Sequence, residues 1–178
     1  ANLNLLDSHD TARILSIASG DEDSVVLALA LLLTFPGAPS IYYGSEIGLE
    51  GVLDPDCRRS FPWDYEDHWN QRILGTTRDL IALRHAHPAL RSAADRIVWP
   101  PDDGDGSMAY AFERTEGDDR LLVVVNAGRE RETQAINRDQ LGFSAAELVW
   151  GAGELTPGEN HSTISIPPRS AAIWVLSS

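Results

Sequence analysis

Cysteine and basic residues are scarce in this 178-residue chain, and each shortage narrows what the protein can do. Cys57 is the single cysteine, so an intramolecular disulfide and a cysteine-based zinc site are both excluded. Lys and Arg number 14 against 27 Asp and Glu, which gives a formal net charge of −13. Because this charge repels phosphate backbones and anionic lipid, we expect neither nucleic acid nor a membrane surface as a partner.

Long apolar runs are also missing. The longest, VVLALALLLTF at residues 25–35, is too short to span a bilayer, and no basic segment with a cleavage site precedes it. We therefore expect a cytoplasmic protein without a signal peptide. Hydrophobic residues still make up 43% of the chain, which is typical of a globular protein with a real core.

The first half of the chain alternates between strand and helix. Residues 3–6 predict a short buried strand, and a helix is expected over residues 20–37, where acidic residues precede an apolar run and Pro36-Gly37 ends it. Residues 38–44 predict a second strand, a long loop follows, and apolar spacing predicts a helix that ends before Pro88. This alternation indicates βα units with a parallel sheet.

The second half changes character near residue 91. PPDDGDGS at residues 100–107 reads as a loop, and EGDD at residues 116–119 reads as a hairpin turn. Six strand-like runs occur at roughly regular spacing: MAYAFER, LLVVVNAG, ETQAI, AELVWG, STISIPP and AAIWVL. The pattern predicts an antiparallel β-sandwich domain over residues 91–178, after a first domain at residues 1–90.

Two βα units cannot close a sheet, because a two-stranded parallel sheet leaves unpaired edges and an uncovered face. The first half therefore reads as the tail of a larger domain. We expect it to associate with the missing part of that domain or with itself. The chain begins with Ala1 rather than Met, directly ahead of a strand, which we interpret as a cleavage boundary.

The first apolar run ends abruptly in DSHDT, residues 7–11, a cluster of carboxylate, imidazole and hydroxyl groups. One interpretation is an exposed turn, since Asp, Ser and Thr are good turn and N-cap residues. The other is a strand whose polar end faces a substrate. These five residues alone leave both interpretations open.

Four stretches in this order, LLDSHD, GAPSIYYGSEIGLEG, DPDCRRSFPWD and LIALRHAHPALR, resemble the C-terminal part of the α-amylase superfamily, glycoside hydrolase family 13. DSHDT and DPDCRR are most similar to its neopullulanase, cyclomaltodextrinase and maltogenic amylase branch. The resemblance implies the last two βα units of a TIM (β/α)8 barrel, with strands 7 and 8 at residues 3–6 and 40–43. A Greek-key β-sandwich is implied for the second half.

The same resemblance assigns roles to individual residues. It makes Asp10 the third catalytic carboxylate, which stabilises the oxocarbenium-like transition state, and makes His9 a donor to the sugar being cleaved. Asp54 and Arg58 match a pair that binds the next sugar, since a carboxylate and a guanidinium fork suit vicinal hydroxyls. Trp63 is a further candidate, because an aromatic ring stacks on the apolar face of a pyranose.

Each of these assignments has a structural alternative. Asp54 precedes Pro55, which is typical of a turn, and Arg58 with Arg59 fits a solvated loop. Trp69 stands at the expected start of a helix, where packing is the better explanation.

The family's nucleophile and general acid come from its fourth and fifth barrel strands, and no stretch of this chain resembles either motif. We therefore predict the C-terminal fragment of a retaining α-glucan hydrolase that is inactive on its own. Its expected substrates are maltodextrin, cyclodextrin or pullulan, cleaved at α-1,4 bonds, with α-1,6 cleavage left open. The family's calcium sites lie mainly upstream, so we expect no metal or cofactor within this chain.

The sequence leaves two alternatives to a hydrolase open. The chain could serve as a non-catalytic carbohydrate-binding or interaction module. It could also come from a transglycosylase of the same superfamily, which differs in how well it excludes water from the acceptor side.

Overall fold

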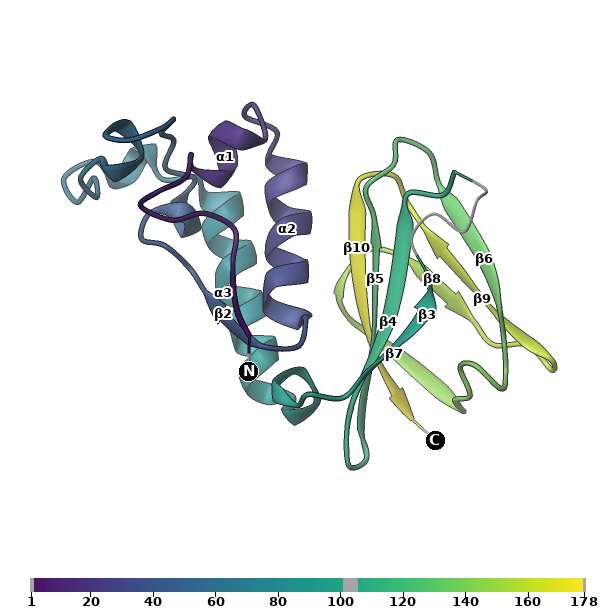
Figure 1. Cartoon of the computed structure of the whole chain (residues 1–178). Helices are drawn as coiled ribbons and strands as arrows, with labels where there is room; N and C mark the ends of the chain where they lie inside the picture. Colours follow the sequence, from purple (N-terminus) through teal and green to yellow (C-terminus); the bar gives the residue numbers. More distant parts are fainter. Residues whose placement is uncertain (1, 101–105, 178) are drawn as a thin grey trace. The chain divides into compact units, whose positions relative to one another are not determined.

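The protein is described here from a computed structural model, which covers residues 2–100 and 106–177 (Figure 1). The middle of the loop predicted at residues 100–107 therefore lies outside the described residues. The chain divides into two compact units, Ala1–Ala86 and His87–Ser178. Each unit has its own secondary structure.

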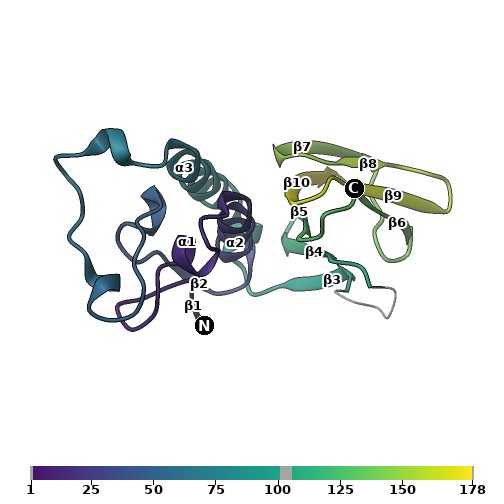
Figure 2. The ribbon, with the colours of Figure 1, turned by 90° about the horizontal axis from the view of Figure 1, so that it is seen from above.

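The first unit combines two short parallel strands with three helices. Strands β1 (Leu3–Leu5) and β2 (Ala38–Ser40) pair in parallel, with Leu3 opposite Ala38 and Leu5 opposite Ser40. The helices are α1 (Ile14–Ile17), α2 (Glu22–Thr34) and α3 (Gln71–Ala86). Helices α2 and α3 lie side by side, as both views show (Figures 1 and 2).

Two expectations for the strands need correction. Leu3 and Leu5 are 67% and 48% exposed, so β1 is not buried, because no other strand of the described residues covers it. The second strand ends at Ser40 rather than at Tyr43. The chain turns at that point, where the N–H of Ser45 donates to the carbonyl of Tyr42, and this turn ends the pairing with β1.

Helix α2 lies inside the predicted range of residues 20–37 and is shorter at both ends. The side chain of Asp21 accepts hydrogen bonds from the backbone N–H groups of Asp23 and Ser24, which caps the first turn. The helix ends at Thr34, just ahead of Pro36, which cannot continue it. The long loop before α3 contains three single-turn 3-10 helices, η1 (Ser45–Ile47), η2 (Asp56–Arg58) and η3 (Glu66–His68).

The second unit consists of two antiparallel sheets. One sheet has five strands in the order β3-β4-β5-β10-β7, and the other has three in the order β6-β9-β8. All six strand-like runs of the sequence form strands, and the predicted hairpin turn joins β4 to β5 at Gly117, whose φ is 58°. The strands are β3 (Asp95–Trp99), β4 (Ala109–Glu116), β5 (Asp119–Asn126), β6 (Glu132–Asn137), β7 (Ala145–Gly151), β8 (Glu154–Thr156), β9 (His161–Ile166) and β10 (Ser170–Ser177).

The two sheets share one hydrophobic core. Side chains from β4, β5 and β10 on one sheet and from β6 and β9 on the other belong to the same buried cluster. Trp99 and Trp174 are both 3% exposed within it, so these two indoles serve packing. A core drawn from two facing antiparallel sheets is the arrangement that alternating side chains on each strand require.

The start of the second unit is held by one carboxylate. Asp119 accepts the backbone N–H of Ala89 at 2.9 Å, and its other oxygen lies 2.9 Å from Nδ1 of His87. These bonds tie the 3-10 helix η4 (Pro88–Arg91) to β5, which is why the unit includes residues 87–90 that the sequence had placed in the first domain. In the described residues, no helix combines the length and apolar character needed to cross a bilayer.

Candidate active site

The turn after β1 is built on a buried carboxylate. Asp7 is 2% exposed and accepts hydrogen bonds from the hydroxyl of Ser45 at 2.7 and 2.8 Å and from the backbone N–H of Ile14 at 2.8 Å. It therefore fixes the first turn of α1 against the segment that follows β2. These contacts give Asp7 a structural role.

His9 and Asp10 follow on this turn and are open to solvent. Nε2 of His9 lies 3.1 Å from Oδ2 of Asp10, and the two side chains are 62% and 70% exposed. The hydroxyl of Ser8 accepts the backbone N–H of Asp10 at 3.2 Å, which orients the turn. The Asp10 carboxylate is exposed while its backbone is fixed by Ser8, so the carboxylate oxygens can accept hydrogen bonds from a ligand.

Arg58 joins the three polar residues that the sequence singled out. Its Nε lies 3.0 Å from Oδ1 of Asp54, and its Nη2 lies 3.5 Å from Oδ1 of Asp10. The same Nε donates to the backbone carbonyl of His9 at 3.0 Å. The turn after β1 and the loop around η2 thus bring His9, Asp10, Asp54 and Arg58 into one group, which we call the polar cluster.

The polar cluster combines two carboxylates with one guanidinium and one imidazole. Such a set offers both acceptors and charged donors, which suits a ligand with several neighbouring hydroxyl groups. The two carboxylates accept hydrogen bonds, and the guanidinium donates them. The cluster can therefore accept and donate hydrogen bonds at the same time.

The aromatic candidates lie farther along the same loop. Trp63 is 71% exposed, and its ring centroid lies 4.3 Å from that of Phe61. Trp69 instead donates from Nε1 to the carbonyl of Pro62 at 3.2 Å and meets Phe61 edge-on at 5.5 Å. Trp63 presents an open aromatic surface, whereas Trp69 packs within the loop as the sequence predicted.

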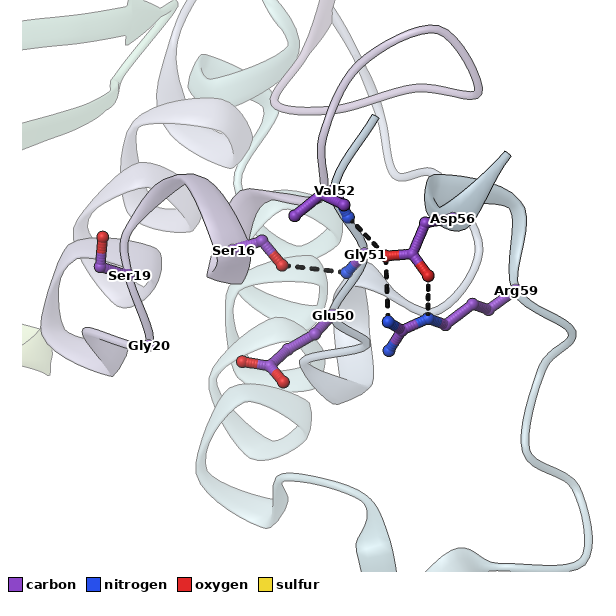
Figure 3. Close-up of a pocket in the computed structure, with 8 residues that line it drawn as sticks. All are labelled: Ser16, Ser19, Gly20, Glu50, Gly51, Val52, Asp56 and Arg59. Atoms are coloured by element: carbon purple, nitrogen blue, oxygen red, sulfur yellow. Dashed lines mark hydrogen bonds and ion pairs between the residues drawn. The ribbon is translucent and has the colours of Figure 1, made fainter. Parts of the chain in front are cut away.

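Asp56 and Arg59, from the same loop, line a pocket of about 310 Å³ (Figure 3). Asp56 accepts the N–H of Val52 at 2.8 Å and two N–H groups of Arg59 at 2.8 and 3.0 Å. The Arg59 guanidinium, and then the Val52 N–H, lower the pKa of Asp56 below its ordinary value of 3.8. This ionised pair closes the loop between residues 52 and 59.

Two tyrosines after β2 border the polar cluster. The ring centroid of Tyr42 lies 6.5 Å from that of His9 and 4.5 Å from that of Tyr43. The Tyr43 side chain, followed by burial, raises the pKa of Tyr42 above its ordinary value of 10.0, so this phenol remains protonated at neutral pH. The sequence analysis had not singled these rings out, although their place at the end of β2 was a usable signal.

Among residues 2–100 and 106–177, no group of three or more His, Cys, Asp or Glu side chains is placed to hold a metal ion. Cys57 is buried, and its thiol donates to the carbonyl of His9 at 3.2 Å.

Comparison with known proteins identifies the family of this chain. Residues 1–82 match the family model "Alpha amylase, catalytic domain". A cyclomaltodextrinase of Geobacillus thermopakistaniensis is 34% identical over the whole chain, and neopullulanase 2 of Thermoactinomyces vulgaris is 40% identical over 78% of it. The chain spans 29% and 23% of the lengths of these two relatives.

Solved structures give the same assignment. A debranching enzyme of Nostoc punctiforme superposes with a TM-score of 0.85 at 42% identity, over 97% of this chain and 35% of that one. A structure of the same enzyme soaked with acarbose gives a TM-score of 0.82 at 40% identity, over 97% of this chain and 33% of that one. The chain therefore belongs to the α-amylase family of glycoside hydrolases, where its relatives include cyclomaltodextrinases, neopullulanases and maltogenic amylases.

Proposed function

We propose that this chain forms the sugar-binding end of the active site in a retaining α-glucan hydrolase. Strands β1 and β2 are strands 7 and 8 of a TIM (β/α)8 barrel in this proposal, and the second unit is the Greek-key β-sandwich that follows it. The single observation that carries the proposal is Arg58, which lies within 3.5 Å of Asp10 and 3.0 Å of Asp54. The parallel pairing of β1 with β2 supports the barrel, because neighbouring barrel strands run parallel and His9 and Asp10 follow the end of β1 in the chain.

Asp10 acts as the carboxylate that neither attacks the sugar nor protonates it. It accepts hydrogen bonds from hydroxyls of the sugar being cleaved, and these bonds strengthen as that sugar distorts towards the oxocarbenium-like state. His9, in contact with Asp10, donates to the same sugar from a ring N–H. Groups of this kind stabilise a transition state by about 2.7–4 kcal/mol in comparable oxyanion sites.

Asp54 and Arg58 hold the next sugar on the non-reducing side. The guanidinium donates to vicinal hydroxyls while the carboxylate accepts from them, which fixes the orientation of the glucan chain. Trp63 adds a stacking surface for a sugar ring, and its 71% exposure supports this role.

The substrates follow from the relatives. We infer maltodextrin, cyclodextrin or pullulan, with cleavage at α-1,4 bonds and with α-1,6 cleavage as an extension that the Nostoc debranching enzyme favours. We expect the whole protein to be cytoplasmic and any calcium to be bound outside this chain. The uncovered face of β1 supports association with the rest of the barrel or with a second copy.

The chain is expected to be inactive by itself, since retaining hydrolysis needs two further carboxyl groups about 5 to 5.5 Å apart. The test is a reducing-sugar assay on the pure 178-residue chain with maltodextrin and with cyclodextrin, repeated after adding the upstream part of the protein. Turnover only in the second assay is the expected result. Hydrolysis by the pure chain contradicts it, and glucan binding without any turnover in either assay favours a non-catalytic module.

A further inference from the structure

Arg13 lies at the centre of the first unit as a fully buried guanidinium. Its exposed fraction is 0%, and no carboxylate pairs with it in the described part of the chain. Its Nη2 has no hydrogen-bond partner there either. Burying a charge in this way is costly, so the contacts that Arg13 does make call for an explanation.

One group of contacts reaches the loop that carries Asp54 and Arg58. The backbone N–H of Arg13 donates to the carbonyl of Gly51 at 2.8 Å, and its Nε donates to the carbonyl of Cys57 at 2.8 Å. In the sequence, Gly51 and Cys57 lie on either side of Asp54. A Cβ at Gly51 would lie 2.7 Å from the carbonyl oxygen of Asp56, which shows how closely the loop is folded on itself.

The other group of contacts reaches the end of β2. Nη1 of Arg13 donates to the carbonyl of Tyr43 at 2.6 Å and lies 3.5 Å from the hydroxyl of Ser45. The guanidinium carbon lies 4.2 Å from the ring centroid of Tyr42 and 4.7 Å from that of Tyr43, within the range of cation–π attraction. One side chain thus joins the loop to the segment after β2.

The loop also contacts the turn after β1, which carries His9 and Asp10. The thiol of Cys57 and Nε of Arg58 both donate to the carbonyl of His9, at 3.2 and 3.0 Å. We propose that Arg13 is a positioning residue, which sets the distance between the Asp54–Arg58 pair and the His9–Asp10 pair. The inference rests on the proposed function, because it concerns how the binding of the second sugar is coupled to the first.

Lysine cannot replace this arginine. The guanidinium is a planar fork whose Nε and Nη1 address two carbonyls at once, whereas an ammonium is a single point charge. Arg13→Lys should therefore release one end of the loop. Arg84 provides a matched control, because its guanidinium also bridges two carbonyls, those of Leu33 at 2.8 Å and Gly37 at 2.6 Å, on helix α3 away from the polar cluster.

The first test needs no enzyme activity. Cys57 is the single cysteine and is buried, so the rate at which a disulfide reagent labels the 178-residue chain reports the opening of this loop. Arg13→Lys should raise that rate at least about tenfold, because one hydrogen bond from a charged donor is lost. Arg84→Lys should change it far less at an equal loss of thermal stability. Equal rates in the two variants overturn the proposal.

Arg13→Gln keeps the test decisive where the lysine variant does not fold. It removes the buried charge and retains one donor, so it also frees one end of the loop. Labelling should accelerate in the same direction as for lysine. Labelling no faster than in the Arg84→Lys variant overturns the proposal.

The second test concerns sugar preference and uses the protein at its full natural length. A p-nitrophenyl maltoside places a second glucose beside Asp54 and Arg58, whereas the glucoside lacks it. Arg13→Lys should lower the ratio of kcat/KM for maltoside over glucoside by about tenfold, with Arg84→Lys leaving the ratio unchanged. An unchanged ratio in Arg13→Lys overturns the positioning role. Full activity of Asp10→Asn in the same assay would instead reject the proposed function.

Discussion

Nη2 of Arg58 lies 3.5 Å from Oδ1 of Asp10, so two segments that are far apart in the sequence meet at one carboxylate. Arg58 also reaches Asp54 at 3.0 Å and the carbonyl of His9 at 3.0 Å. Because one guanidinium contacts the three other residues of the polar cluster, a substitution of Arg58 should change the positions of all of them.

Arg58→Lys should weaken sugar binding in the full-length protein. A lysine ammonium keeps the charge and loses the fork, so we expect KM for maltotriose to rise about tenfold and kcat to change less. Steady-state kinetics measure both. Arg72→Lys, on an exposed arginine that pairs with Asp23 and Glu22 at the start of α2, serves as the control. A KM equal to that of the control would remove Arg58 from the site.

Trp63→Ala should weaken ligand binding, whereas Trp69→Ala should lower stability. The exposed Trp63 should affect ligand affinity alone, with the Kd for maltotriose raised about threefold to tenfold, because aromatic contacts contribute about 0.5–1.5 kcal/mol. Trp69→Ala should lower the unfolding midpoint, since it removes the bond to Pro62 and the contact with Phe61. Calorimetric titration and thermal melts separate the two. An unchanged Kd in Trp63→Ala contradicts the stacking role.

Asp56 should contribute stability that depends on pH. Folding lowers its pKa below 3.8, so the ionised form is favoured in the folded state, and this contribution is present above that pH. It is lost as the pH falls through the lowered pKa. The difference in unfolding midpoint between wild type and Asp56→Asn should therefore be full at about pH 6 and narrow steadily below about pH 4. A difference that is constant across this range would contradict the role of the Asp56–Arg59 pair.

Two glycines on the first unit should respond in opposite directions to alanine. A Cβ at Gly51 would lie 2.7 and 2.9 Å from backbone atoms of Asp56 and Cys57, so Gly51→Ala should destabilise the protein by about 1–3 kcal/mol. Nothing lies within 4 Å of a Cβ at Gly75, inside α3, and Gly75→Ala should stabilise the helix by about 0.5–1 kcal/mol. Denaturant midpoints measure both. Equal effects would show that the loop around Gly51 has room to move.

Much of the fold could be predicted from local sequence. Helix α2 has a capping Asp21 and a proline stop, and the strands of the second unit alternate with turn residues, so both signals lie within a few positions of each element. Helix α1 was missed because it has four residues, and its first N–H is satisfied by Asp7 from outside the helix. The short strands β3 and β8 gave no comparable local pattern.

Some residues of the site could also be predicted from the sequence, and others could not. Asp10 and Arg58 could be proposed because their short motifs resemble a known family, and the structure brings their side chains together. Arg13 could not, since nothing near it in the sequence marks it. Its acceptors are the carbonyls of Tyr43 and Cys57, and only the folded chain places these distant backbone groups around one guanidinium.

Asp10 is proposed to stabilise charge on the sugar at the bond being cleaved. The most direct measurement is kcat of the full-length protein with Asp10→Asn, beside Asp67→Asn as a matched control on an exposed carboxylate that also neighbours a histidine. We expect kcat to fall roughly 10²- to 10³-fold in Asp10→Asn alone, with the fold intact by circular dichroism. A kcat within about twofold of the control, well short of the loss that such a group causes, would contradict it.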